Sequence, residues 1–530
     1  DIIGTSGSSN AAHNAISVTG TNSTAPVTLW SNADYSGTGS ITIPYYFDVT
    51  SQAGAITIGG AASATESSPT GYAVATSGAG VYVGNSNVAT DQTKITTTSG
   101  NIVIRGKLQA TSGTGSAIDM NSGSNITSGT GTITLDGQSY QPTGTSGHAM
   151  YLNHNGGYTS TITTGSTTSP AITLTGVVTS AATSPSTNAN GITTWTASGA
   201  MNISATGLNA DINMTGAASS ATTDSIEFNM VNLYANGGKI NIDGGTQVVA
   251  LATNSGANNI GGSSSSSMSG DVTIKSDKIT IGTTTTTFKN ASKVYLISKA
   301  NSFNGAQNFG SGMVTTNIGY LGFGLVTNTS DITVSGTNSV AGTIDVYGAA
   351  LTISGAQTTT AGGDINLNGT GAVSISANQT SADQVNVTGS NIAVSGSLSA
   401  AATTGTGLLL KATGDITTSG SRSFTTSGSN ATFWSDSDNN GSGRIGFDAS
   451  NSITTSGGKV TIAGGADDGA STVTGSARTA NDGFPDGYAA GNGSTSGCVS
   501  GTGTIQGVFF GTAMTISSGN GDVFIAGKGL

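Results

Sequence analysis

The segment AITIGGA, residues 55–61, places Ile56 and Ile58 on either side of a threonine, and two glycines follow. Side chains two residues apart in a β-strand point to the same face, so the two isoleucines form an apolar face and Thr57 lies on the other. Glycine readily adopts the positive φ that tight corners require. The segment therefore predicts a short strand, buried on one face, that is followed at once by a turn.

Variants of this strand return along the whole chain of 530 residues. A single strand of this kind cannot hold its own fold, but stacked strands bury one another's aliphatic pairs and satisfy their backbone hydrogen bonds. The signals recur at roughly 20–30 residues, or multiples of that spacing, which suits one coil per signal. The pairs expected to form the core include Ile56 and Ile58, Ile102 and Ile104, Ile240 and Ile242, Ile365 and Leu367, and Val460 and Ile462.

These features predict an all-β fold, a right-handed parallel β-helix (β-solenoid) with irregular coil lengths and loop insertions. Amphipathic segments of helical period are nearly absent from the sequence. With roughly 25 residues per coil and about 4.8 Å per rung, we expect a single continuous rod on the order of 100 Å long.

The composition narrows the classes of function. Only 8% of the residues are charged and 82 are glycine. Such a bias is typical either of disorder or of short strands joined by polar turns, and the regular spacing of the aliphatics favours the strands. The formal net charge of −11, without any basic run, argues against nucleic acid as a partner. The sequence has no stretch of 18 apolar residues, so no membrane span is predicted.

The sequence also contains a longer repeat, which includes several of the short strand repeats. TLWSNADYSGTGSI at 28–41 matches TFWSDSDNNGSGRI at 432–445, so that Trp30 corresponds to Trp434. The match ends with GNIVIRGK at 100–107 against GDVFIAGK at 521–528. The residues added in the second copy fall in the Gly-, Ser- and Asp-rich stretch 466–506, which we expect to be a loop.

This longer repeat defines the expected domains. Residues 1–430 would form one long solenoid superrepeat, and residues 431–530 would begin a second copy that matches about 28–108. The parent protein is expected to be a tandem array of such units.

DSDNNGSG, residues 436–443, is the clearest candidate for a metal site. Asp436, Asp438 and Asn440 supply oxygen atoms at alternate positions and Gly441 is the sixth residue, as in the first half of a calcium loop. The twelfth position is Phe447, where an EF-hand needs a bidentate Glu, so an EF-hand is excluded. The three residues are candidate ligands of a weak calcium site, and no other cofactor is expected. The alternative is a turn that is held by its own Asx hydrogen bonds.

Other residues offer fewer possibilities. Trp30 and Trp434 each precede a turn and are candidates either for a sugar-stacking surface or for burial at a corner. Tyr45 and Tyr46 in IPYYFDV, residues 43–49, are candidates for an exposed contact surface. His148 and His154 are too far apart in a strand to chelate one metal ion. Cys498 has no neighbouring histidine in sequence and is expected to be an inactive thiol.

The strand repeats resemble a known kind of protein. GDITTSG at 414–420, NSITTSGGKVTIAGG at 451–465 and GGDINLNG at 362–369 resemble the repeat regions of the filamentous haemagglutinin type of large bacterial exoprotein, which is exported by two-partner secretion. The resemblance covers essentially the whole chain. It implies an extracellular β-helical rod on the bacterial cell surface that acts as an adhesin or matrix fibre. Copies of the chain, surface glycans or matrix polysaccharide are the implied partners.

We therefore expect a structural and adhesive rod, not an enzyme. A polysaccharide lyase or hydrolase on a β-helix is one alternative, but it needs paired carboxylates, or a carboxylate with Arg or Lys, on neighbouring rungs. Arginines such as Arg105 and Arg444 stand alone in the sequence. A threonine-array ice-binding solenoid is the other alternative, suggested by KITTTSG at 94–100 and GTTTTTFK at 282–289. Threonine ladders also stabilise ordinary stacks of strands.

Overall fold

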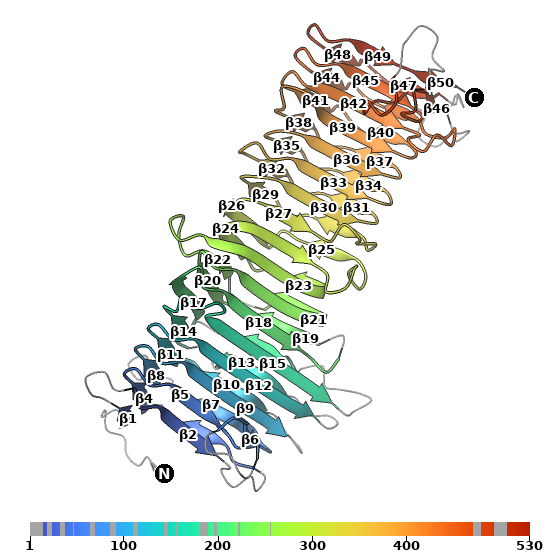
Figure 1. Cartoon of the computed structure of the whole chain (residues 1–530). Helices are drawn as coiled ribbons and strands as arrows, with labels where there is room; N and C mark the ends of the chain where they lie inside the picture. The colour runs from blue at the N-terminus through green and yellow to red at the C-terminus, as the bar shows by residue number, and fades with distance from the viewer. Residues whose placement is uncertain are drawn as a thin grey trace. The chain divides into compact units, whose positions relative to one another are not determined.

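The structure is a computed structural model, and every regular element in its described residues is a β-strand. The chain divides into two compact units, whose strands are labelled in Figure 1. Unit 1 comprises Asp1–Ser276 with Thr284–Thr286, and unit 2 comprises Asp277–Thr283 with Thr287–Leu530. The described residues are 14–18, 24–31, 38–45, 47–63, 69–84, 92–109, 115–141, 147–154, 157–180, 189–194, 199–220, 223–254, 256–469, 479–491 and 506–529.

Unit 1 is a stack of coils whose strands form three parallel ladders (Figure 1). Ile102 pairs with Ile133, which pairs with Ile172, so one coil takes 31 or 39 residues. The first ladder contains β2 (Val27–Ser31), β5 (Ile56–Gly60), β9 (Ile102–Gln109), β12 (Ile133–Gln141), β15 (Ile172–Ser180), β18 (Ile212–Ala217) and β21 (Ile240–Leu251). The second contains β1 (Asn14–Val18), β4 (Phe47–Ser51), β8 (Lys94–Thr97), β11 (Asn125–Ser128), β14 (Ser160–Thr164), β17 (Met201–Leu208), β20 (Val231–Asn236) and β22 (Asn258–Gly261). The third contains β3 (Ile41–Ile43), β7 (Gly78–Val83), β10 (Gly115–Asn121), β13 (Gly147–His154), β16 (Ile192–Thr194), β19 (Asp224–Phe228) and the end of β21, while β6 (Ala73–Ala75) pairs with β9.

Unit 2 has the same three-ladder plan with shorter coils. Ile344 pairs with Ile365, which pairs with Val385, so one coil takes 21 or 20 residues. The first ladder contains β27 (Leu321–Phe323), β30 (Ile344–Gly348), β33 (Ile365–Gly369), β36 (Val385–Gly389), β39 (Thr406–Ala412), β42 (Asn430–Ser435), β45 (Val460–Gly464) and β49 (Val523–Ile525). The second contains β25 (Gln307–Phe309), β28 (Ile332–Val334), β31 (Leu351–Ile353), β34 (Val373–Ile375), β37 (Ile392–Val394), β40 (Ile416–Thr418), β43 (Ile445–Phe447) and β47 (Val508–Phe510).

The third ladder of unit 2 contains β29 (Asn338–Val340), β32 (Gln357–Thr359), β35 (Gln379–Ser381), β38 (Leu398–Ala400), β41 (Ser423–Thr426), β44 (Ser452–Thr454) and β48 (Thr515–Ser517). The short strands β46 (Ala489–Ala490) and β50 (Gly527–Lys528) pair with each other, and β26 (Met313–Ile318) precedes β27. The remaining strands, β23 (Ser269–Ile281) and β24 (Thr286–Ile297), contain the points at which the sequence passes between the two units.

The core is the interior of the coils. The aliphatic residues at alternate strand positions point inward, and the residues between them, such as Arg105, Asp345 and Asn366, point outward. All ten core residues named from the sequence lie there with at most 1% of their surface exposed. The all-β parallel solenoid expected from the sequence is thereby confirmed.

The third ladder of unit 2 also places polar residues in the interior, which the sequence pattern did not indicate. Asn338 and Gln357 are inward residues on successive rungs and are buried. The Nδ2 atom of Asn338 donates to Oε1 of Gln357 at 2.9 Å, and Nε2 of Gln357 donates to the carbonyl of Gly355 at 2.9 Å. These amides bond the turn carbonyls, which would otherwise be buried without a donor.

Candidate functional site

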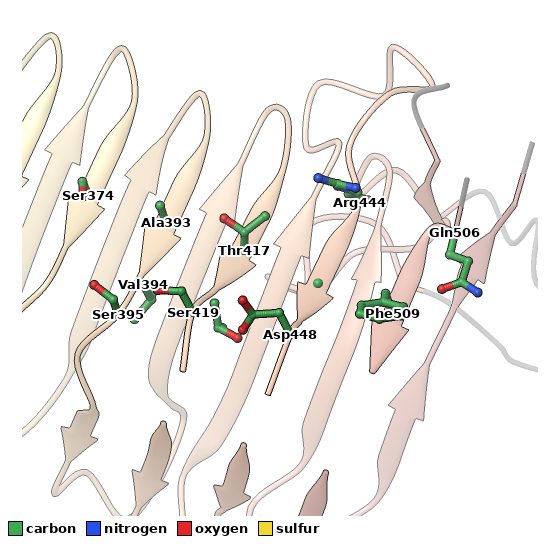
Figure 2. A pocket seen from close by; sticks show the side chains of 12 residues that line it. Ser374, Ala393, Val394, Ser395, Thr417, Ser419, Arg444, Asp448, Gln506 and Phe509 are labelled. Atoms are coloured by element: carbon green, nitrogen blue, oxygen red, sulfur yellow. The ribbon is translucent and has the colours of Figure 1, made fainter. Parts of the chain in front are cut away.

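A groove lies on the outer side of the second ladder of unit 2 (Figure 2). It has a volume of about 480 Å³ and crosses five successive strands, from β34 to β47. Its side chains are mostly small and uncharged. The lining residues are Ser374, Ala393, Val394, Ser395, Thr417, Thr418, Ser419, Arg444, Gly446, Asp448, Gln506 and Phe509.

One row of groove residues comes from the middle positions of the five strands. Ser374, Ala393, Thr417, Gly446 and Phe509 are register partners from one strand to the next. Each lies between two inward-facing neighbours, so its own side chain faces outward. The small residues form the bottom of the groove: a Cβ atom added to Gly446 would meet no heavy atom within 4 Å. Phe509 forms an apolar wall at one end, as Figure 2 shows.

A second row comes from residues that immediately follow the strands. Ser395, Ser419 and Asp448 follow β37, β40 and β43, and Figure 2 shows them along one side of the groove. The Oδ1 atom of Asp448 is shielded from solvent and accepts no hydrogen bond from any described residue. The carboxylate of Asp448 places a negative charge at this edge of the groove, while its shielded Oδ1 atom is not exposed to a ligand there.

Arg444 lies at the opposite edge and is held by Asp415 on the preceding coil. Its Nε atom is 3.3 Å from Oδ2 of Asp415, and its backbone N donates to Oδ1 of the same carboxylate at 3.0 Å. The structure corrects the interpretation that this arginine stands alone, because residues 29 apart in sequence are neighbours across one rung. The charge of Arg444 is largely compensated by Asp415.

The candidate calcium residues form a compact turn in unit 2. The Oδ1 atom of Asp436 accepts from the backbone N of Gly441 at 3.1 Å, and Nδ2 of Asn440 donates to Oδ2 of Asp438 at 2.8 Å. Burial raises the pKa of Asp436, against the lowering effect of its backbone hydrogen bonds. The three residues come together and bond mainly to one another and to their own backbone, which is the arrangement of an Asx turn. No group of three or more His, Cys, Asp or Glu residues suited to a metal ion occurs in the described part of the chain. The calcium site stays a prediction.

The candidate contact aromatics differ from one another. Trp434 has 4% of its surface exposed, and its Nε1 donates to the carbonyl of Gly465 at 2.7 Å. The suggestion that Trp434 forms a surface contact is therefore wrong, because the indole fills a corner of the core. Trp30 is half-buried and Tyr45 is 49% exposed. Tyr46 lies outside the described residues.

The histidines and the cysteine do not come together in the described structure. His148 is half-buried, packs edge-on against Tyr151 with 4.9 Å between the ring centres, and accepts from the backbone N of Asn190 at 3.2 Å. The side chain of His154 and all of Cys498 lie outside the described residues.

Sequence reasoning missed a polar cluster around Glu227 on β19. Its carboxylate accepts five hydrogen bonds, so both oxygen atoms are fully engaged and the group acts as a structural anchor. The donors are Asn190, Thr193, Asn229, Thr253 and Asn254, at 2.7 to 3.2 Å. Asn and Thr are so common in this chain that nothing in the sequence distinguishes these five residues.

A second cluster forms on the outer face of the first ladder of unit 1. Arg105 and Asp136 are register partners on neighbouring rungs, and the hydroxyl of Tyr72 donates to Oδ2 of Asp136 at 2.6 Å. Burial, together with this bond, raises the pKa of Tyr72 well above its ordinary value. The tyrosine is thus held as a neutral donor, and the Asp136 carboxylate is engaged by it.

Among the described residues, the structure contains no helix of the length and apolarity needed to cross a membrane. In the comparisons with known proteins, no family model, curated protein or solved structure matches this chain.

Proposed function

We propose that the chain is a structural and adhesive β-solenoid of a large bacterial surface exoprotein, which forms fibres or attaches cells to a matrix outside the cell. The observation that carries the proposal is the continuous filling of the coils. In unit 2, Ile344, Ile365 and Val385 stack in register and have none of their surface exposed. An interior packed in this way makes a stiff support, and it leaves the outer faces and loops for contacts.

The outer faces favour association between copies of the chain. On the second ladder of unit 1, Nδ2 of Asn232 donates to Oδ1 of Asn202 at 2.7 Å, and Nδ2 of Asn259 donates to Oδ1 of Asn232 at 2.9 Å. Such ladders are uncharged, and only 8% of all residues carry charge. Neighbouring copies can therefore lie against each other without strong electrostatic repulsion.

The hydrogen bonds that the carboxylates accept favour a structural role over an enzymatic one. A catalytic acid or base needs a carboxylate that is free to exchange a proton with substrate. Glu227 accepts five hydrogen bonds, and Asp136 accepts the Tyr72 hydroxyl. Of the residues that line the described groove, Asp448 alone is acidic, whereas glycoside hydrolysis generally uses two carboxyl groups.

The ice-binding alternative gains no support from the arrangement of the threonines. Thr96 aligns with Thr127 and Thr163 on the outer face of unit 1, but the column continues as Ser204 and Tyr234. The bulky tyrosine interrupts the flat array. In the run at 283–287, Thr286 points into the core.

Electron microscopy of the purified full chain over a range of concentrations tests the proposal. We expect fibres or lateral bundles that grow with concentration, and no new reducing ends when the chain is incubated with polysaccharides. A double variant, Leu208→Lys with Val326→Lys, adds positive charge at two side chains that are 62% and 77% exposed. We expect it to form weaker bundles while its coils stay folded. A chain that stays monomeric at all concentrations, or that cleaves polysaccharide, would contradict the proposal.

A further inference from the structure

We propose that the groove across β34, β37, β40, β43 and β47 binds a neutral polysaccharide, which lies along the direction in which the strands stack. The inference rests on the proposed function, for which it names the class of ligand. Its basis is the geometry of the groove, the hydroxyl groups of the serine and threonine residues that line it, and the half-buried ring of Phe509.

The first argument is periodicity. The residues at the bottom of the groove repeat once per strand, and adjacent strands in a ladder lie about 4.8 Å apart. Thr417 and Ser374 present hydroxyl groups in the row of middle residues, and Ser395 and Ser419 present them in the row beside it. A surface that repeats in one direction fits a polymer that also repeats, and a chain of sugar units offers hydroxyl groups at regular intervals.

The second argument is the balance of apolar and polar groups. Binding sites for small organic ligands combine an apolar surface with a few placed hydrogen-bonding groups. Phe509 is half-buried, and its register partner Gly446 carries no side chain that could cover the ring. The C–H face of a sugar ring can pack on such an aromatic ring, while its hydroxyl groups reach the serine and threonine rows.

The third argument is charge, which favours a neutral ligand over an acidic one. The guanidinium of Arg444 is 3.3 Å from the Asp415 carboxylate and is therefore compensated. Asp448 adds a negative charge at the other edge of the groove. A chain of uronic acids or sulfated sugars would face this carboxylate, and among the residues that line the groove only the compensated Arg444 is a cation.

The experiment measures binding of two soluble probes to the full chain by calorimetry and affinity electrophoresis. One probe is a neutral β-glucan oligosaccharide and the other is a polyuronate of equal length. We expect the neutral glucan to bind and the polyuronate to bind at least about tenfold more weakly. Gly446→Val should weaken glucan binding by about tenfold or more, because the new side chain points into the empty bottom of the groove. Phe509→Ala should do the same, because it removes the apolar wall.

Thr333→Val is the matched control, because Thr333 is also an outward middle residue of the second ladder but lies on β28, outside the groove. It should leave glucan affinity unchanged, and circular dichroism should show an intact β-fold in all three variants. The inference is overturned if the neutral glucan does not bind, if the polyuronate binds more tightly, or if Gly446→Val binds the glucan as the native chain does. Loss of glucan binding with fibres intact would remove the groove assignment alone, whereas loss of fibres with glucan binding intact would remove the structural role.

Discussion

The two copies of the long repeat fold in the same way in different surroundings. In unit 1, Trp30 on β2 pairs with Gly59 on β5, and in unit 2, Trp434 on β42 pairs with Ala463 on β45. The correspondence includes isolated antiparallel bridges, since Gly39 bridges Val74 and Gly443 bridges Ala490. The residues shared by the two copies are thus sufficient to specify which strands pair and in which register.

Burial differs between the copies although the pairing is the same. Ile104 pairs with Ile58 on one side and Leu135 on the other and is fully buried. Its counterpart Ile525 pairs with Ile462 and is 42% exposed. The two copies therefore pair alike, whereas the exposed fraction of an inward residue differs between them.

The largest expected effect comes from truncating these two isoleucines. Ile104→Ala should lower the unfolding free energy of the surrounding coils by about 2–5 kcal/mol, because it leaves a cavity between two filled rungs. Ile525→Ala should cost less than about 1 kcal/mol, because much of its side chain already faces solvent. Urea unfolding followed by hydrogen exchange of the peptides that contain β9 and β49 measures both losses.

Leu208→Ala serves as the control for side-chain removal at a site that is 62% exposed, and it should have little effect. Equal losses of unfolding free energy for Ile104→Ala and Ile525→Ala would show that the ladder position, and not the exposed fraction, determines the contribution of an inward residue.

The difference between strand pairing and burial also explains how far the sequence could predict the fold. Aliphatic pairs such as Ile365 and Leu367 identified the first ladder because period-2 alternation is visible in any strand with one apolar face. The third ladder of unit 2 was largely missed, because inward positions there are held by amides such as Gln357 and Gln379, which a hydropathy pattern assigns to the surface. Their inward position depends on turn carbonyls that accept their hydrogen bonds, and the sequence alone does not place those carbonyls.

The sequence did not predict the groove, for a related reason. Its bottom consists of small residues that carry no chemical signal, and its aromatic wall comes from a distant segment. Gly446 and Phe509 are register partners on successive rungs although a long insertion separates them in the chain. The length of that insertion does not show that the next strand returns to the same ladder. For Trp434 the sequence left open either a sugar-stacking surface or burial at a corner, and the structure places this residue in the core.

A smaller effect is expected from the two tryptophans. In Trp434→Phe the carbonyl of Gly465 loses the Nε1 donor inside a buried corner, which should cost about 1–3 kcal/mol. Lys411, whose Nζ lies 3.7 Å from the centre of the indole ring, also interacts less strongly with a phenyl ring. Trp30→Phe should cost less than about 1 kcal/mol, because Nε1 of Trp30 has no hydrogen-bond partner among the described residues.

Hydrogen exchange of β2 and β42 in the two variants provides the measurement for the tryptophans. An equal increase in the hydrogen exchange of β2 in Trp30→Phe and of β42 in Trp434→Phe would contradict the expected difference between the two tryptophans.

The smallest expected effect concerns Asp436, where the first copy of the repeat has Asn32. Burial raises the pKa of Asp436, with a further contribution from the charge of Asp438, so the native state holds this proton to a higher pH than the unfolded chain does. The contribution of Asp436 to the unfolding free energy is then greatest below the unfolded pKa near 4, and it falls as the pH rises through the native value. Asp436→Asn keeps an oxygen acceptor for the Gly441 amide and removes the charge. We expect the variant to equal the native chain at about pH 3 and to exceed it by less than about 1 kcal/mol at pH 7.

Urea unfolding at a series of pH values, with and without calcium, measures this difference and also tests the predicted metal site. Without calcium, a native chain that is more stable than Asp436→Asn at neutral pH would show that the turn favours the charged carboxylate, which contradicts the raised pKa. If millimolar calcium stabilises the native chain but not the variant, Asp436 acts as a ligand, because a bound cation offsets the cost of burying the carboxylate charge. If calcium stabilises neither, Asp436 serves only as the acceptor that closes its turn.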